Sequence, residues 1–138
     1  MCIRDRTYTL PFSFSFFGVS YGSVIVSSQG YLQFAGPNDT GGDTPSVAGL
    51  LANARIAPFW SNFNTAAATG DGVFVSTTAT SVTFRWLAGL SSNPVNVAVT
   101  LNSNGSFSFA YGAGNANRVP VIGVSAGNGC LLYTSRCV

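Results

Sequence analysis

Two aspartates in one short polar segment are the residues best suited to hold a metal ion. Asp39 and Asp43 lie four positions apart in a glycine-containing loop, and Asn38 precedes them. Calcium takes about six to eight oxygen ligands, which carboxylates, amides and backbone carbonyls can supply. These residues therefore predict a weak calcium site, which Asp71 would join if the fold brings it near. The alternative is an ordinary turn, because the spacing differs from an EF-hand and Asp-Gly segments commonly form turns.

Aromatic side chains offer a second kind of chemistry, the stacking of a ring on a sugar. Tyr21 and Trp60 are the two candidates for an exposed platform of this kind. The alternative for Trp60 is a place in the core, since it lies in an irregular apolar block. Trp86 alternates in phase with Val82 and Phe84, so we expect it to be buried.

The chemistry that enzymes most often use is missing from the body of the chain. Thr7 to Gly129 contain no histidine, lysine, glutamate or cysteine, and their formal charges are those of Arg55, Arg85, Arg118, Asp39, Asp43 and Asp71. Most mechanisms need a proton carrier or an activated nucleophile. We therefore predict that the protein is not an enzyme and needs no cofactor, with calcium the one exception. An aspartate pair could do the work of a glycosidase, but solvated loop aspartates are usually structural.

Charge and hydropathy limit the partners. The net charge of +2 arises at the ends of the chain, because the three arginines and three aspartates of the body cancel. A nucleic-acid-binding protein presents a clustered basic face, which this composition cannot form. No apolar run reaches the roughly 18 residues that span a bilayer. We expect neither nucleic-acid binding nor a membrane span. Arg85 lies on the polar face of its strand, where we expect a solubilising charge.

The two ends differ in composition from the middle. Residues 1–6 and 130–138 hold all three cysteines and the only methionine, and the strings MCIRDR and CLLYTSRCV resemble translated sequencing-adapter sequence. We therefore expect artefactual tails on a single domain over residues 7–129. The alternative is a disulfide pair with one spare thiol.

Period-two alternation of apolar and polar residues dominates the body and predicts strands with one buried face. It is clearest over residues 12–16, 82–86, 95–101 and 107–111. Further short strands are expected over residues 23–26, 31–34, 73–76 and 119–125. Because few helices are available to cover their apolar faces, these strands predict an all-β fold, an antiparallel β-sandwich of about nine short strands.

Turn chemistry separates the predicted strands. Asn104-Gly105 tolerates positive φ and predicts a tight hairpin. Turns are also expected over residues 27–30, 77–80 and 91–94. Residues 35–46 predict an exposed loop, and residues 47–54 a short helical turn.

Two blocks of the body resemble nidogen-like (NIDO-type) β-sandwich domains. The first is Leu10-Pro11-Phe12-Ser13-Phe14-Ser15-Phe16-Phe17-Gly18 with the later Ser27-Ser28-Gln29-Gly30-Tyr31-Leu32-Gln33-Phe34, and the second is Ile56-Ala57-Pro58-Phe59-Trp60. In this sequence Gln29 stands where such domains usually have asparagine. Asn62 and Asn64 stand where acidic residues are common. The body stops at Gly129, so a final strand of such domains is expected to be missing.

The resemblance implies a non-catalytic extracellular module, for adhesion or assembly, in a larger bacterial surface or secreted protein. Its partners would be neighbouring domains of that protein, with a glycan or a surface protein as a further partner. The alternative function is a carbohydrate-binding module attached to a secreted enzyme. The expected location is therefore secreted or at the cell surface.

Overall fold

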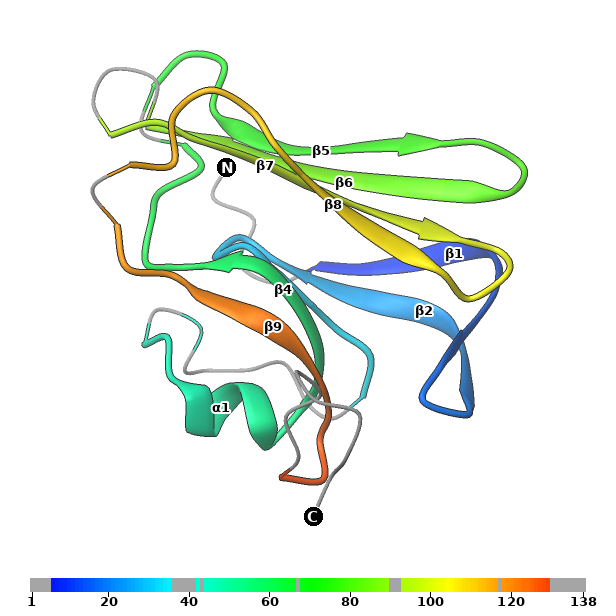
Figure 1. Cartoon of the computed structure of the whole chain (residues 1–138). Coiled ribbons are helices and arrows are strands. Elements are labelled where there is room, and N and C mark those ends of the chain that lie inside the picture. The colour runs from blue at the N-terminus through cyan, green and yellow to red at the C-terminus, as the bar shows by residue number, and fades with distance from the viewer. Residues whose placement is uncertain are drawn as a thin grey trace.

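Nine strands in two antiparallel sheets make up most of the computed structural model, which describes residues 6–35, 42, 44–66, 68–89, 93–116 and 118–129 (Figure 1). The first sheet has the order β1-β2-β3-β4-β9 and comprises Arg6–Phe16, Val19–Ser27, Tyr31–Gln33, Ala54–Trp60 and Val121–Ala126. The second has the order β5-β6-β7-β8 and comprises Gly72–Thr77, Ser81–Ala88, Val95–Asn102 and Phe107–Tyr111. The predicted antiparallel β-sandwich is confirmed.

The main core lies between the two sheets. Along β6 and β7 the inward-facing residues are buried and their neighbours are more exposed, as period-two alternation predicts. Phe14 and Phe16 of β1 complete this core from the other sheet. Trp86 is fully buried, as predicted, and its indole Nε1 donates to the Ser27 carbonyl oxygen at 2.7 Å. This bond ties the second sheet to the first.

The predicted turns over residues 27–30, 77–80 and 104–105 join neighbouring strands, and the one over 91–94 lies partly outside the described residues. Asn102 to Ser106 join β7 to β8, with Gly105 at φ 86° and the Asn104 Oδ1 accepting from the Ser106 amide at 3.0 Å. A second turn joins β2 to β3, with Gly30 also at φ 86°. There the Gln29 side chain reaches the Phe63 amide, whose N–H donates to its Oε1 at 2.9 Å. Gln29 thus connects the turn to the chain after β4.

The elements differ from the prediction in two main places: β4, Ala54–Trp60, was not predicted as a strand, and the N-terminal strand is longer than predicted. β1 begins at Arg6, inside the stretch assigned to the N-terminal tail. It is longer than the alternating phenylalanine run, and its register with β2 shifts between Thr9 and Phe14. The predicted helical turn is the short helix α1, Val47–Leu51, capped by the Ser46 hydroxyl oxygen, which accepts from the Gly49 amide at 2.9 Å.

Helix α1 covers the face of the first sheet that points away from the second sheet (Figure 1). It packs against β4 and β9. Every residue of β4 is therefore buried, since one face meets the main core and the other meets α1. Among the helical residues that the structure describes, none forms a helix of the length and apolarity that a bilayer crossing requires.

Candidate functional site

A second, smaller cluster of buried side chains lies under α1. It consists of Tyr31, Leu50, Ala57 and Trp60, with Val121 packed beside it. The register of β4 against β9 shifts between Ala57 and Trp60, and Pro58 lies within this irregularity. Proline cannot donate to a ladder, so it favours such positions. The shift turns Trp60 toward α1, while Ile56 and Phe59 stay in the main core.

Arg55 is the charged centre of this region and is fully buried. It lies opposite Gln33 in the pairing of β3 and β4. Its Nε and Nη2 both donate to the Gln33 Oε1, at 2.9 and 2.8 Å. Its guanidinium carbon lies 4.3 Å from the ring centre of Tyr31 and 4.7 Å from that of Trp60. Two aromatic faces and an amide oxygen thus surround the cation, an arrangement that suits a guanidinium better than an ammonium.

The same cluster anchors α1 and the base of the polar loop. A side chain at Gly49 would collide with Trp60, so the glycine lets α1 approach the indole closely. The Arg55 Nη1 also donates to the Gly49 carbonyl oxygen at 3.5 Å. On the loop side, the Trp60 Nε1 donates to the Gly42 carbonyl oxygen at 2.7 Å. Arg55 and Trp60 therefore fix the helix and one point of the loop to the first sheet.

The predicted calcium ligands Asp39 and Asp43 lie outside the described residues. Asp71, the third aspartate, has a structural role in the turn before β5. Its Oδ2 accepts from the amides of Ala68 and Gly89, at 3.0 and 3.1 Å. These bonds join the start of β5 to the end of β6.

The two aromatic candidates for a sugar platform lie in different clusters. Trp60 has 1% of its surface exposed and packs on Tyr31, with ring centres 5.1 Å apart. The prediction of an exposed platform at Trp60 is therefore wrong, because the sheet and α1 cover its indole. The alternative, a place in the core, is where the structure puts it. Tyr21 is half-buried against Phe34, with ring centres 5.2 Å apart. It contacts the main core.

An apolar groove lies between α1 and β9. Its volume is about 490 Å³, and its lining residues are Pro45, Ser46, Val47, Leu50, Val119, Pro120, Val121 and Ile122. Val119 is 94% exposed, and Val47 and Ile122 are also exposed. Exposed apolar side chains that gather around a groove are typical of contact surfaces. Leu50 belongs both to this lining and to the smaller buried cluster, and Val121 belongs to the lining and packs against that cluster.

A family model described as NIDO related matches residues 4–133. The chain belongs to the NIDO-related family. This confirms the resemblance that the two sequence blocks indicated. The match includes residues 4–6 and 130–133, which the prediction assigned to the tails. No curated protein and no solved structure matches the chain.

The buried Arg55 cluster of this NIDO-related domain was not predicted from the sequence. The signal available was indirect: residues 54–60 are apolar without alternation except at Arg55, which indicates a strand covered on both faces. A charge inside such a strand must be buried with hydrogen-bond partners. The partner Gln33 lies 22 positions away, and only the strand pairing shows that the two residues meet.

The Tyr111 side chain is expected to make the stability of the NIDO-related domain fall at alkaline pH. Its hydroxyl donates to the Pro58 carbonyl oxygen at 2.7 Å, and partial burial raises its pKa above the usual value of 10.0, while 48% of the residue's surface stays exposed. The unfolded chain then ionises at lower pH than the folded one, so this contribution to stability is complete below about pH 10 and is lost as the pH rises through the folded pKa. In urea titrations, Tyr111→Phe should be less stable at pH 7 by about 1 kcal/mol and should lose less stability above pH 10. Equal alkaline losses in both proteins would contradict this role.

Proposed function

We propose that this NIDO-related domain is a non-catalytic adhesion or scaffold module of a larger bacterial protein that is secreted or displayed at the cell surface. Its partners are neighbouring domains of that protein and a surface protein outside it. The domain acts passively, as a rigid sandwich that presents a contact surface. The family match supports a module of this general kind.

The single observation that carries the proposal is the exposed apolar rim of the groove between α1 and β9. Val47, Val119 and Ile122 expose large apolar side chains there. Val119 and Ile122 flank the start of β9, and α1 is held from beneath by Trp60 and Arg55. A fixed apolar surface suits protein contact, because little ordering is required when a partner binds.

The ionisable groups whose contacts are described support a structural use of charge. Arg55 is buried between Tyr31 and Trp60. The Asp71 carboxylate accepts two backbone amides, and the Arg85 Nε donates to the Asn96 Oδ1 at 3.0 Å. Arg55 and Asp71 hold neighbouring parts of the sandwich together, and Arg85 makes an exposed bond between β6 and β7.

Carbohydrate binding is the less well supported alternative. It depended on Trp60 and Tyr21 as stacking platforms. Trp60 is buried, and Tyr21 is half-buried against the ring of Phe34 and the main core. A tyrosine in this position offers a sugar less of its face than an open platform would.

Binding to immobilised extracellular proteins tests the proposal. The purified domain is passed over fibronectin, laminin, collagen and mucin, and in parallel over a glycan array. We expect binding to at least one protein, weakened about tenfold or more by Val119→Asp, because a charge at the centre of an apolar contact opposes desolvation.

Val19→Asp is the matched control, since Val19 is 52% exposed and lies on β2, outside the groove. It should bind as the unmodified domain does. Binding that is confined to glycans and abolished by Tyr21→Ala would favour the carbohydrate-binding alternative. Equal loss in the Val119→Asp and Val19→Asp variants would show that the groove is not the contact surface.

A further inference from the structure

Strand β5 is an exposed edge of the second sheet. It pairs with β6 on one side, and the strand order of the described sheet ends there. Gly72–Thr77 has the sequence GVFVST, with no charge and no proline. Phe74 and Val75 are 48% and 43% exposed. An edge strand of this kind is a template for pairing with another strand.

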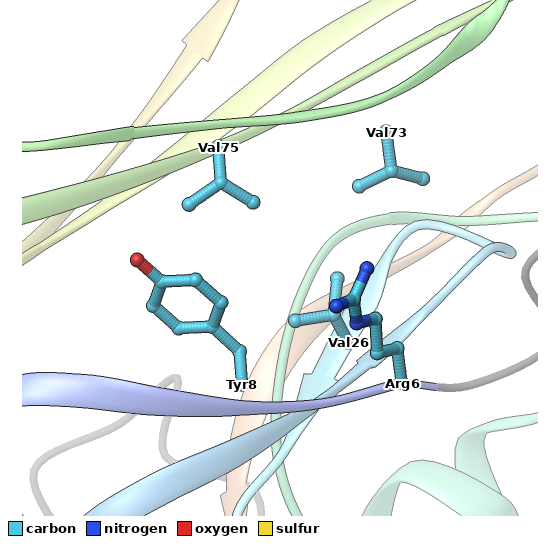
Figure 2. A pocket seen from close by; sticks show the side chains of 5 residues that line it. All are labelled: Arg6, Tyr8, Val26, Val73 and Val75. Atoms are coloured by element: carbon cyan, nitrogen blue, oxygen red, sulfur yellow. The ribbon is translucent and has the colours of Figure 1, made fainter.

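The inward face of β5 is only partly covered by the other sheet. Val73 and Val75 lie opposite Trp86 and Phe84, which are fully buried, so both valines point toward the other sheet. Figure 2 shows them above Tyr8, Val26 and Arg6, which rise from the first sheet. These five residues line a pocket of about 260 Å³. An inward-facing valine that is 43% exposed means that the sandwich is only partly closed at this edge, where Val73 packs on the main core and the Tyr8 hydroxyl bonds the Thr77 Oγ1 at 2.9 Å.

Two of the other three edges of the described sheets carry features that oppose pairing. β1 contains Pro11 and a register shift after Thr9. β9 follows Pro120 and packs against α1. Prolines, irregular register and a covering helix are known protections of sheet edges, which β1 and β9 have and β5 lacks.

The fourth edge, β8, lacks these protections too. The Tyr111 hydroxyl of β8 donates to the Pro58 carbonyl oxygen, and the Tyr8 hydroxyl bonds the Thr77 Oγ1 of β5. Each of these two edges is therefore tied to the first sheet by a side-chain bond. β5 differs from β8 in the apolar pocket beneath it.

An added strand would satisfy both features of this edge. A small apolar molecule would fill the pocket but would leave the backbone groups of β5 unpaired by protein. A strand that pairs with β5 binds those backbone groups and places alternate side chains over the pocket. The occupant is therefore an extended strand with apolar residues at alternate positions.

The sequence of β5 itself meets this description, and its pattern is symmetric. Val73-Phe74-Val75 reads the same in both directions, so a two-fold axis through Phe74 gives matched pairs on both faces. Phe74 then lies opposite the partner's Phe74 on the outer face, and Val73 opposite the partner's Val75 on the inner face. If the axis passed through Val75 instead, the pair of Val75 with the partner's Val75 would be the one apolar pair left, because Phe74 would lie opposite the partner's Ser76. Self-complementary contacts are those that form symmetric dimers.

We propose that two copies of this domain associate by antiparallel pairing of their β5 strands, with Phe74 on the two-fold axis. The two four-stranded sheets become one continuous sheet across the axis, and the inward valines of both copies cover the two pockets. The contact carries no formal charge on either strand. A strand pair of this length buries less surface than a stable dimer usually needs, so the association is weak and depends on concentration. This proposal stands independently of the groove between α1 and β9.

Sedimentation equilibrium under reducing conditions tests the association, over about 10 µM to about 1 mM. The average mass should rise with concentration from 14.3 kDa toward twice that value. Phe74→Lys should weaken dimerisation about tenfold or more, while Val19→Lys, a control on β2 with 52% exposure, should leave it unchanged. A protein that stays monomeric throughout overturns the proposal and leaves the pocket to a small apolar ligand. Equal weakening by both variants overturns it as well.

Disulfide cross-linking tests the register separately. Cys2, Cys130 and Cys137 are first replaced by serine, and a single cysteine is introduced as Phe74→Cys or Ser76→Cys. Residues opposite each other on the axis have Cα atoms about 4.5–5.5 Å apart, which suits a disulfide. In this register the two Ser76 positions are offset by about 13 Å along the strands. Phe74→Cys should therefore form covalent dimers under mild oxidation, and Ser76→Cys should not. Faster cross-linking through Ser76→Cys would overturn the register and with it the proposal.

Discussion

Replacing Arg55 with alanine is expected to lower the free energy of unfolding by about 3–5 kcal/mol. The substitution empties the space between Tyr31 and Trp60 and leaves the Gln33 Oε1 without the two donors that it now has. Both effects occur in a fully buried site, where neither water nor neighbouring side chains easily replace the lost contacts. Urea unfolding followed by circular dichroism measures the change.

Two further arginine variants separate charge from geometry. Arg85→Ala removes an exposed arginine from β6 and should change stability by no more than about 0.5 kcal/mol. Arg55→Lys keeps the charge but cannot donate twice to one oxygen while lying flat against two rings, so it should be nearly as destabilising as alanine. A stable Arg55→Ala variant would contradict the structural importance of this cluster.

Replacing Gly30 with alanine is expected to destabilise the domain by about 3 kcal/mol or more. Gly30 has φ 86°, and a methyl group there would overlap the carbonyl oxygen of Phe59. The Gly30 carbonyl oxygen also accepts from the Phe59 amide at 3.3 Å, so the turn and β4 cannot separate without breaking a bond. Thermal and urea unfolding measure the loss.

Gly18→Ala is the matched control for backbone conformation. Gly18 has φ 78°, but no atom lies within 4 Å of the place where its methyl group would be. Gly18→Ala should lower the free energy of unfolding by only about 1–2 kcal/mol, the cost of placing alanine in the left-handed conformation. The difference between the two variants measures the overlap with Phe59. Equal losses would show that the close approach at Gly30 is relieved by a small shift.

Much of the sandwich could be predicted from the sequence because several of its strands are buried on one face only. In β6 and β7, Val82, Trp86 and Val97 point into the core, while the residues between them are more exposed, so period-two alternation is visible in the chain itself. The Asn104-Gly105 hairpin was predictable for a similar reason. Positive φ is favourable for few residue types, and they stand together at the turn.

The cluster around Arg55 could not be predicted, because it depends on contacts between distant segments. Alternation fails in β4, since α1 covers the second face and the irregularity at Pro58 turns Trp60 outward from the main core. A single arginine in the sequence is expected at the surface unless the residues that surround it in space are known. The open edge at β5 was hidden for a related reason: Val73 and Val75 alternate like core residues, and only the arrangement of the two sheets shows that one of them remains half exposed.

The order of strands in the first sheet determines how the domain responds to a pulling force. β1 and β9 occupy opposite edges of this sheet and run in the same direction, because three antiparallel strands lie between them. The start of β1 and the end of β9 therefore lie at opposite ends of the sheet. Tension applied at these two points would shear the backbone hydrogen bonds of all five strands together. The second sheet, whose strands lie between β4 and β9 in the chain, would carry little of the load, and the buried Arg55 would lie within the stretched layer.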